Sequence, residues 1–513
     1  MLTNKKVWLI CAENFSWPMH YLAKELRSTV KEIRALFIQP GEAYFNSIDY
    51  RTFCQLNKDL NVYETSSICE QYIRLHNKIN QNLDMRYIQE IEDKYTHFSG
   101  LNEQFLTEMT LTPYYHDRKY YKYIDQNKIL LYAQLYYQYL EKLFKKDKPN
   151  FILDCDVDFF GRSALLEVSH YFNIKYISID HSRIDGYIIP TDRLCKSISP
   201  KVKKYFENIN SKDSSDDMMA DYKQIINKMG FTPDHFKKMK EDQMFNIKKL
   251  FKRLIIQNLY FIKSFSLRKV KLNVINNISS PIVSDTFLGL LGIYKYYLRR
   301  IYLEYFNVFK NVKLENINYL LVPLHVIPES STTVLSPIYI NELFIIESLS
   351  KSIKADQFVV VKEHWSMIGH RPISFYKRLK KLHNVILINP KQYDNPKEFI
   401  TNSDLVVTIS GSTAVEALFL GVNSLVFSDV IYSLMDGIKK IVIDSNLSKI
   451  IEEHIKYKPS KQDQISYINT IKHIGEKVDL KPLLLRPEIS DRSLVDANIN
   501  ALRMTFEKGI KYL

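Results

Sequence analysis

Glycine and cysteine are scarce in this chain of 513 residues, which contains only 13 glycines and 5 cysteines. The cysteines form no CxxC pair, so they predict neither a zinc site nor a disulfide framework, and they favour a reducing compartment. They are Cys11, Cys54, Cys69, Cys155 and Cys195. The chain also lacks GxGxxG, and it lacks GxxxxGK followed by Ser or Thr, so neither a dinucleotide fingerprint nor a P-loop is indicated.

Long apolar runs are absent as well. No stretch of about 18 apolar residues occurs, and the opening MLTNKKVWLICAENFSW has too short an apolar core for a signal peptide. We therefore expect a cytoplasmic protein, with any membrane contact limited to the inner face of the cytoplasmic membrane. Residues 246–272 mix Lys and Arg with Leu, Ile, Phe and Tyr. This pattern fits a helix that lies on anionic lipid, or equally a helix with one solvated basic face.

The charge balance is basic, with 71 Lys and Arg against 57 Asp and Glu and a formal net charge of +14. The excess is not gathered into an arginine-rich arm or a nucleic-acid module, so nucleic acid is not an expected partner. An anionic substrate or an anionic membrane surface suits the charge better. A hydrophobic fraction of 46% is typical of a folded globular protein, and the length predicts two domains.

Apolar runs alternate with amphipathic stretches along the chain. In the N-terminal half this pattern predicts strands at 6–12 and 33–40 and a strand–loop–helix–strand unit at 150–182. Mainly helical stretches are predicted at about 50–148 and 197–312. In the C-terminal half six strands are predicted, with helices between most of them, at 319–324, 358–363, 385–388, 405–409, 424–427 and 441–443.

This alternation predicts parallel, doubly wound sheets whose ligands bind at the carboxyl ends of the strands. The predicted fold class is α/β and GT-B-like, with two Rossmann-like domains facing a cleft and helical insertions in the N-terminal half. The predicted domains span 1–315 and 316–480, and a helical tail is predicted at 481–513.

The stretch DLVVTISGSTAVEALFLG, at 404–421, predicts a strand, a tight turn and a helix. Small residues in the turn let a phosphate approach the free N–H groups at the start of the helix. These candidate phosphate contacts are Ser410, Gly411, Ser412 and Thr413. Glu416 stands three residues after Thr413, which is the spacing of a capping box, so it either caps the helix or binds a ribose hydroxyl.

Polar residues also follow two other predicted strands of this half. The loop at 321–335 contains His325, Glu329, Ser331 and Thr332, which face either a ligand or solvent. The strand at 358–363 runs into Lys362, Glu363 and His364. Lys362 or His364 could neutralise charge on a departing phosphate, although a charged loop in solvent would show the same pattern.

An acidic loop follows the first strand of the 150–182 unit. Asp154, Asp156 and Asp158 alternate, so in an extended chain they share one face. Crowded carboxylates raise each other's pKa, which favours a general base. A divalent cation is the other option, but the glycine and distant glutamate of a calcium loop are missing. Asp180 and His181 end the next strand, close enough to orient one of these acids.

Together these segments resemble the bacterial capsule and surface-polysaccharide glycosyltransferases, the group that includes the β-Kdo transferases. The resemblance lies in PLHVIPESST (323–332), VKEHWSMIGHRPISFYKRL (361–379), VVTISGSTAVEALFLG (406–421) and LDCDVDFFGRSALLEV (153–168). It implies a metal-independent GT-B enzyme that needs no cofactor. The C-terminal domain would bind a CMP- or UDP-linked sugar, and the N-terminal domain would hold the acceptor and the base.

The resemblance places His364 near the leaving phosphate, Ser410, Ser412 and Thr413 on the phosphate-contacting turn, and Glu416 on a ribose. Trp365 departs from the proline that this family often has. The resulting hypothesis is an inverting transferase, with Asp156 as the preferred base and Lys362 and His364 as cations. It would add a sugar, Kdo among the candidates, to a capsule or lipopolysaccharide glycan or a lipid-linked acceptor. The alternatives are a nucleotide-sugar epimerase and a non-catalytic glycan- or membrane-binding assembly subunit.

Overall fold

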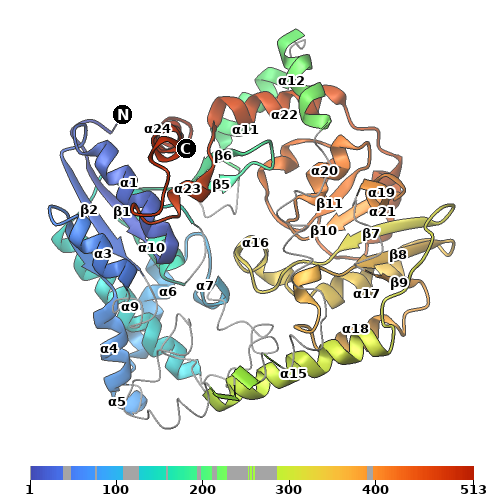
Figure 1. Ribbon diagram of the computed structural model, residues 1–513, viewed down its shortest axis with the longest axis horizontal. Helices are drawn as coiled ribbons and strands as arrows, with labels where there is room; N and C mark the ends of the chain where they lie inside the picture. Colours follow the sequence, from blue (N-terminus) through green and yellow to red (C-terminus); the bar gives the residue numbers. More distant parts are fainter. Residues whose placement is uncertain are drawn as a thin grey trace.

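The computed structural model describes most of the chain, namely residues 2–38, 48–75, 78–107, 126–156, 160–192, 198–210, 216–227, 252, 255–256, 258–259, 286–389 and 397–513. Within these residues two β-sheets lie side by side, each flanked by helices (Figure 1). The predicted α/β class with two Rossmann-like halves is therefore confirmed.

The first sheet has seven strands in the order β13-β6-β5-β4-β1-β2-β3. They are β1 (Lys6–Cys11), β2 (Glu32–Phe37), β3 (Asn61–Glu64), β4 (Phe151–Leu153), β5 (Lys175–His181), β6 (Tyr187–Thr191) and β13 (Glu476–Lys477). Strands β1 to β5 are parallel, whereas β6 is antiparallel to both β5 and β13. In β1, Val7 and Leu9 enter one buried layer and Trp8 and Ile10 enter the other. This alternation is expected of a central strand that is covered on both faces.

Helices cover both faces of this sheet. One layer contains α4 (Ser66–Leu75), α5 (Ile79–Asn82), α6 (Met85–Lys94), α7 (Leu101–Thr107), α9 (Gln126–Lys146) and α10 (Phe160–Tyr171). The other contains α1 (Ser16–Leu26), α3 (Ile48–Leu56) and α24 (Arg492–Tyr512). Three further helices, α11 (Pro200–Asn210), α12 (Asp216–Ile226) and α15 (Thr286–Tyr305), lie between the two sheets in sequence.

The second sheet has six parallel strands in the order β12-β11-β10-β7-β8-β9. They are β7 (Asn318–Pro323), β8 (Gln357–Lys362), β9 (Val385–Ile388), β10 (Leu405–Thr408), β11 (Ser424–Val426) and β12 (Ile438–Lys440). The first five predicted strands are confirmed. The sixth was wrong, because the strand lies just before the predicted 441–443. β12 is an edge strand whose lysines are exposed, so no apolar run marks it.

The helices of the second half connect these strands. They are α16 (Ser330–Thr333), α17 (Glu342–Ser352), α18 (Ile373–Leu379), α19 (Lys397–Thr401), α20 (Thr413–Phe419), α21 (Leu447–Lys456), α22 (Lys461–Ile474) and α23 (Leu480–Leu483). α22 packs against α11 and α12, so helices distant in sequence share a core with α20.

The C-terminal segment returns to the first sheet (Figure 1). β13 pairs with β6, and α24 packs against α1, β5 and β6. The predicted terminal helix is confirmed and extends to Tyr512. The sequence patterns missed β3, β6 and β13, which are short strands at or next to an edge of the sheet.

No helix in the described parts of the chain is both long enough and apolar enough to cross a bilayer. Most of the basic stretch at 246–272 lies outside the described residues.

The docking of α24 can be tested at Phe506, which is fully buried in the core between α24 and the first sheet. We expect Phe506→Ala to lower the free energy of unfolding by about 3–5 kcal/mol, because it leaves a cavity in a packed core. Leu494→Ala on the same helix is the control, since Leu494 is 52% exposed and its loss should cost about 0.5 kcal/mol or less. Calorimetry of the purified chain measures both, and equal costs would contradict the docking.

Candidate active site

Three predicted loops meet at one edge of the second sheet, because β10, β7 and β8 are neighbours and their carboxyl ends lie together. The loop after β7 carries His325, whose Nε2 is 3.0 Å from the Thr408 Oγ1 at the end of β10. The Ser410 hydroxyl donates a hydrogen bond to the Ser331 carbonyl. The loops at 321–335 and 404–413 are thus in direct contact.

The glycine of the 410–413 turn is required by close packing. The Gly411 N–H donates to Thr408 Oγ1 at 3.2 Å. A Cβ at Gly411 would lie 2.6 Å from this oxygen and 3.3 Å from His325 Nε2. The Tyr432 hydroxyl donates to the Ser410 carbonyl at 2.6 Å and fixes the turn from the other side.

Glu416 does not form the capping box that its spacing allowed. α20 begins at Thr413, and its N-cap Ser412 makes no side-chain cap hydrogen bond. Instead, the Ser412 hydroxyl donates to Glu416 Oε1 at 3.3 Å. Burial raises the pKa of the Glu416 carboxyl, against opposing effects of the Ser412 hydrogen bond and the charges of Lys362 and Arg183. Two cations from different halves of the molecule therefore act on this helix start.

The Lys362–His364 loop is held by a buried ion network. Glu363 is only 2% exposed, and it accepts hydrogen bonds from Arg371 Nε at 3.0 Å and the Tyr376 hydroxyl at 2.6 Å. Arg371 Nη2 also donates to the His325 carbonyl at 2.6 Å, and Arg371 Nη1 lies 2.7 Å from Glu342 Oε2. Glu363 is therefore enclosed by this network and positions the loop.

Glu342 links this network to His325. Its Oε1 accepts the His325 backbone N–H at 2.7 Å and lies 3.1 Å from His325 Nδ1. Burial alone would raise the pKa of Glu342, but Arg371 and the bonds from His325 outweigh it and lower the pKa. Glu342 thus remains a carboxylate that fixes the imidazole against Thr408.

The surroundings of His364 oppose the cationic state that the sequence suggested. Its Nδ1 accepts the Ser366 backbone N–H at 3.4 Å and lies 2.8 Å from the Ser366 hydroxyl. Burial, followed by the charge of Arg371, lowers the pKa of His364 to about 4. The ring is neutral at pH 7, and with Nδ1 as acceptor its proton is on Nε2, which makes His364 a hydrogen-bond donor.

The remaining predicted residues of the second half lie on the same loops. Lys362 ends β8, with its Nζ 5.0 Å from the centre of the Phe399 ring. Glu329 is the N-cap of α16 and accepts the Ser331 hydroxyl at 2.9 Å. Thr332 is buried and donates to the Glu329 carbonyl at 2.9 Å.

The aspartates of the acidic loop in the first half differ in their burial. Asp154 is fully buried and accepts hydrogen bonds from Arg162 Nε at 2.7 Å and the Tyr176 hydroxyl at 2.6 Å. Asp156 is partly exposed, with its Oδ2 3.3 Å from Arg162 Nη1. Both carboxylates thus contact the Arg162 guanidinium, and of the two Asp156 lines a cavity. Asp158 lies outside the described residues.

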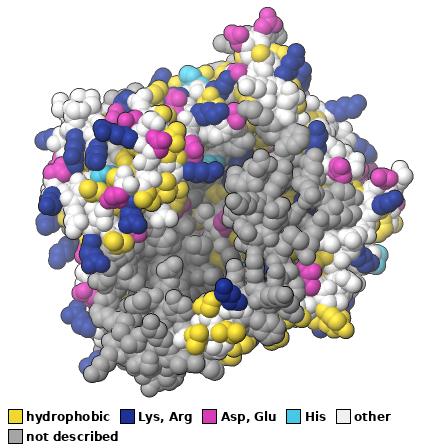
Figure 2. All heavy atoms as spheres, in the orientation of Figure 1, with side chains coloured by type: hydrophobic (Ala, Val, Ile, Leu, Met, Phe, Trp, Pro, Cys, Tyr) yellow, Lys and Arg dark blue, Asp and Glu magenta, His cyan; other side chains and the backbone are white. Residues whose placement is uncertain are grey.

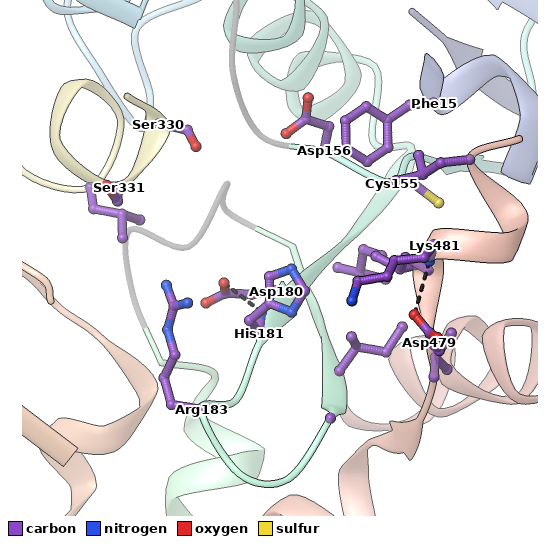
Figure 3. A pocket seen from close by; sticks show the side chains of 17 residues that line it. Phe15, Cys155, Asp156, Asp180, His181, Arg183, Ser330, Ser331, Asp479 and Lys481 are labelled. Carbon is purple, nitrogen blue, oxygen red and sulfur yellow. Dashed lines mark hydrogen bonds between the residues drawn. The ribbon is translucent and has the colours of Figure 1, made fainter. Parts of the chain in front are cut away.

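A cavity of about 440 Å³ lies between the two halves, at the carboxyl ends of β1, β4 and β5. Figure 3 shows Asp156 and Phe15 on one side, Ser330 and Ser331 on the other, and Asp180 and His181 below them. Of the predicted residues, Asp156, Asp180, His181 and Ser331 line this cavity. His325, Lys362, His364 and the 410–416 turn do not. No group of three His, Cys, Asp or Glu side chains suited to a metal ion occurs in the described part of the chain.

Arg183 is the main cavity residue that sequence reasoning missed. It stands in the β5–β6 turn with φ of 65°, a left-handed conformation that is uncommon for arginine. The Tyr467 hydroxyl donates to the Ser182 carbonyl at 2.7 Å and holds this turn against the second half. Enclosure and then the Arg183 charge lower the pKa of His181, while Asp180 and Asp156 oppose the shift. The charge state of His181 therefore depends on Arg183, Asp180 and Asp156.

Some of the other cavity residues that were not predicted could have been found from the sequence, and some could not. Phe15 follows β1, whose carboxyl end lies at the same edge, and Ser330 adjoins the predicted Ser331. Both could have been found from strand order. Asp479 and Lys481 reach the cavity only because the C-terminal segment returns to the first sheet, and no local pattern marks them.

Neither a protein-family model nor a curated protein matches the chain. Solved structures similar to it include KpsC of Thermosulfurimonas dismutans, a beta Kdo 2,7 transferase, with 13% identity and a TM-score of 0.28 over 64% of this chain and 79% of that chain. A KpsC beta Kdo 2,4 transferase of that organism has 10% identity and a TM-score of 0.31 over 64% and 85%. The UDP-GlcNAc 2-epimerase of Methanocaldococcus jannaschii has 10% identity and a TM-score of 0.28 over 92% and 99%. These are distant, fold-level likenesses with TM-scores below 0.5.

The Arg371 network can be tested by removing its single cation. We expect Arg371→Met to lower the free energy of unfolding by about 3–5 kcal/mol, because two buried carboxylates lose their partner. Arg378→Met is the control, since Arg378 pairs with Glu347 at the surface and should cost less than about 1 kcal/mol. Thermal unfolding measures both, and a small loss in Arg371→Met would contradict the network.

The neutral state of His364 predicts a dependence of stability on pH. The unfolded chain binds a proton at His364 near pH 6.5, whereas the folded chain does so only near pH 4. The wild-type chain therefore loses stability as pH falls from about 7 to 4, and His364→Gln removes this loss. We expect the Tm of His364→Gln to fall below that of the wild type by less at pH 5 than at pH 7.5, because pH 5 lies inside this range and pH 7.5 lies above it. An equal or larger deficit at the lower pH would show that the ring is charged.

Proposed function

We propose that this chain is an inverting, metal-independent glycosyltransferase. It moves a sugar from a nucleotide-activated donor to a hydroxyl of a glycan or lipid-linked glycan. The observation that carries the proposal is the cavity between the halves, with the carboxylate of Asp156 on one side and the serines of α16 on the other. A carboxylate next to a cleft of this size suits general-base chemistry on a bound hydroxyl.

In the proposed reaction, Asp156 takes the proton of the acceptor hydroxyl. The acceptor oxygen forms a bond to the anomeric carbon on the face opposite the nucleotide. The bond from that carbon to the phosphate oxygen breaks, and the nucleotide leaves with the electron pair. Arg162 keeps Asp156 oriented through its 3.3 Å contact.

The leaving phosphate would bind near the start of α20. Lys362 and Arg183 both act on Glu416 there, so positive charge is already present before the phosphate departs. His364 would donate from Nε2 as a neutral group. Fixed donors and cations of this kind supply much of the stabilisation in transfer reactions. Glu416, kept from capping the helix, is the proposed ribose contact.

The finer assignment follows the residues that resemble the β-Kdo transferases. Kdo is the first sugar to test, with a capsule or lipopolysaccharide fragment as the acceptor and CMP or UDP as the carrier. Arg183 and Lys481 line the cavity together with the carboxylates of Asp156, Asp180 and Asp479, so an anionic acceptor would bind against the two cations.

The proposal is tested with a thermal-shift screen of CMP, UDP, GDP and CDP, followed by transfer assays with sugars of the nucleotide that binds. We expect one nucleotide to raise the Tm, because a ligand of the native state stabilises it. Asp156→Asn should lower kcat by about 10²–10⁴-fold, since it removes the base. It should keep the nucleotide-dependent shift, since Asp156 does not line the donor loops.

Asp59→Asn is the matched control, because Asp59 forms only a surface ion pair with Arg27 and should leave kcat unchanged. Absence of a shift with every nucleotide would exclude the transferase. A stereoisomer formed from the donor alone, without an acceptor, would assign an epimerase. Unchanged kcat in Asp156→Asn would exclude this residue as the base.

A further inference from the structure

α15 exposes a row of large apolar side chains. Positions 291, 298 and 305 are seven residues apart and share one face of the helix, and 301 lies beside them. The exposed fractions are 39% for Leu291, 64% for Leu298, 38% for Ile301 and 78% for Tyr305, and Phe306 just beyond the helix is 58% exposed. Figure 2 shows hydrophobic side chains along the lower edge of the molecule, where Figure 1 places α15.

The opposite face of α15 is firmly packed. Leu303 is buried in the core of the second half, and Arg299 Nη1 donates to the His370 carbonyl at 2.9 Å. Gly369, at φ of 89°, lets the helix approach closely, since a Cβ there would lie 3.0 Å from the Tyr296 carbonyl oxygen. The exposed row is therefore presented by a fixed helix.

A second segment extends the apolar surface. Asn258 Nδ2 donates to the Tyr294 hydroxyl at 2.6 Å, which places Asn258 against α15. Ile255 and Leu259 in that segment are each 60% exposed, and Ile256 is 40% exposed. We call this surface the α15 patch, comprising Ile255, Ile256, Leu259, Leu291, Leu298, Ile301, Tyr305 and Phe306.

The charge around the α15 patch selects its occupant. Among the described residues of these two segments, the exposed charged side chains are Lys252 and Lys295. Two copies of the patch facing each other would bring these lysines together, which opposes self-association. An anionic lipid surface instead attracts them, and it accepts Leu, Ile and Tyr at the level of its headgroups. The net charge of +14 favours the same surface over long range.

We propose that the α15 patch docks the protein onto a bilayer that contains anionic lipid. The apolar row enters the headgroup region, and the lysines contact lipid phosphates. This docking does not depend on the proposed transferase activity, because it uses none of the cavity residues. Failure of one leaves the other intact.

The test is flotation of the full chain with vesicles of phosphatidylcholine alone, or with about one third phosphatidylglycerol. We expect the wild-type chain to float with the anionic vesicles at low salt and to release as salt screens the lysines. Leu298→Ser combined with Ile301→Ser should lower the vesicle partition coefficient at least about tenfold, because two apolar anchors are lost. The Tm of this variant should not change, since both side chains are exposed.

Met85→Ser combined with Val442→Ser is the matched control, since it removes exposed apolar side chains from separate places (50% and 56% exposed) and should bind like wild type. Wild-type protein that does not float with anionic vesicles would overturn the proposal. So would a Leu298→Ser/Ile301→Ser variant that floats as well as wild type. A wild-type dimer that this variant converts to a monomer in sedimentation would assign the patch to subunit contact instead.

Discussion

Each half of the molecule depends on a buried carboxylate at the end of a strand, held by an arginine eight residues later and by a tyrosine hydroxyl at 2.6 Å. The two sets are Asp154, Arg162 and Tyr176, and Glu363, Arg371 and Tyr376. An unpaired charge at such a depth costs several kcal/mol, so each loop is strongly biased toward the arrangement that keeps its pair. These pairs therefore fix the loops that follow β4 and β8.

These pairs also position other candidate site residues, at the cavity and beyond it. Arg162 contacts Asp156 at the cavity. Arg371 donates a hydrogen bond to the carbonyl of His325, and the His325 ring contacts Thr408 at the end of β10. The β5–β6 turn adds Arg183 from the first half to the charges that act on Glu416 in the second. The positions of these side chains and the charges around them thus depend on the same buried pairs.

Much of the fold could be predicted, because strands buried on both faces are continuous apolar runs such as FVVV at 358–361. The short strands β3, β6 and β13 escaped prediction, since each has too few residues to show a clear apolar run. Among the site residues, strand-end position identified Asp156, His181 and Ser331. Strand-end position also selected Asp154 and Glu363, which are buried, because the sequence of a charged loop does not show which of its side chains are buried.

The sequence by itself determined the α/β class, the polar strand ends and the small residues of the 410–413 turn, since these follow from local periodicity and side-chain size. Only the tertiary structure decided which carboxylates are buried in ion pairs, that His364 is neutral, and that Gly411 is needed for close packing. It also brought Arg183 and Lys481 to the cavity. The reason is physical: burial, pKa and cavity shape depend on which side chains pack together in three dimensions. Some of these neighbours are far apart in sequence, as Lys481 is from Asp156 at the cavity, and such packing leaves no local pattern.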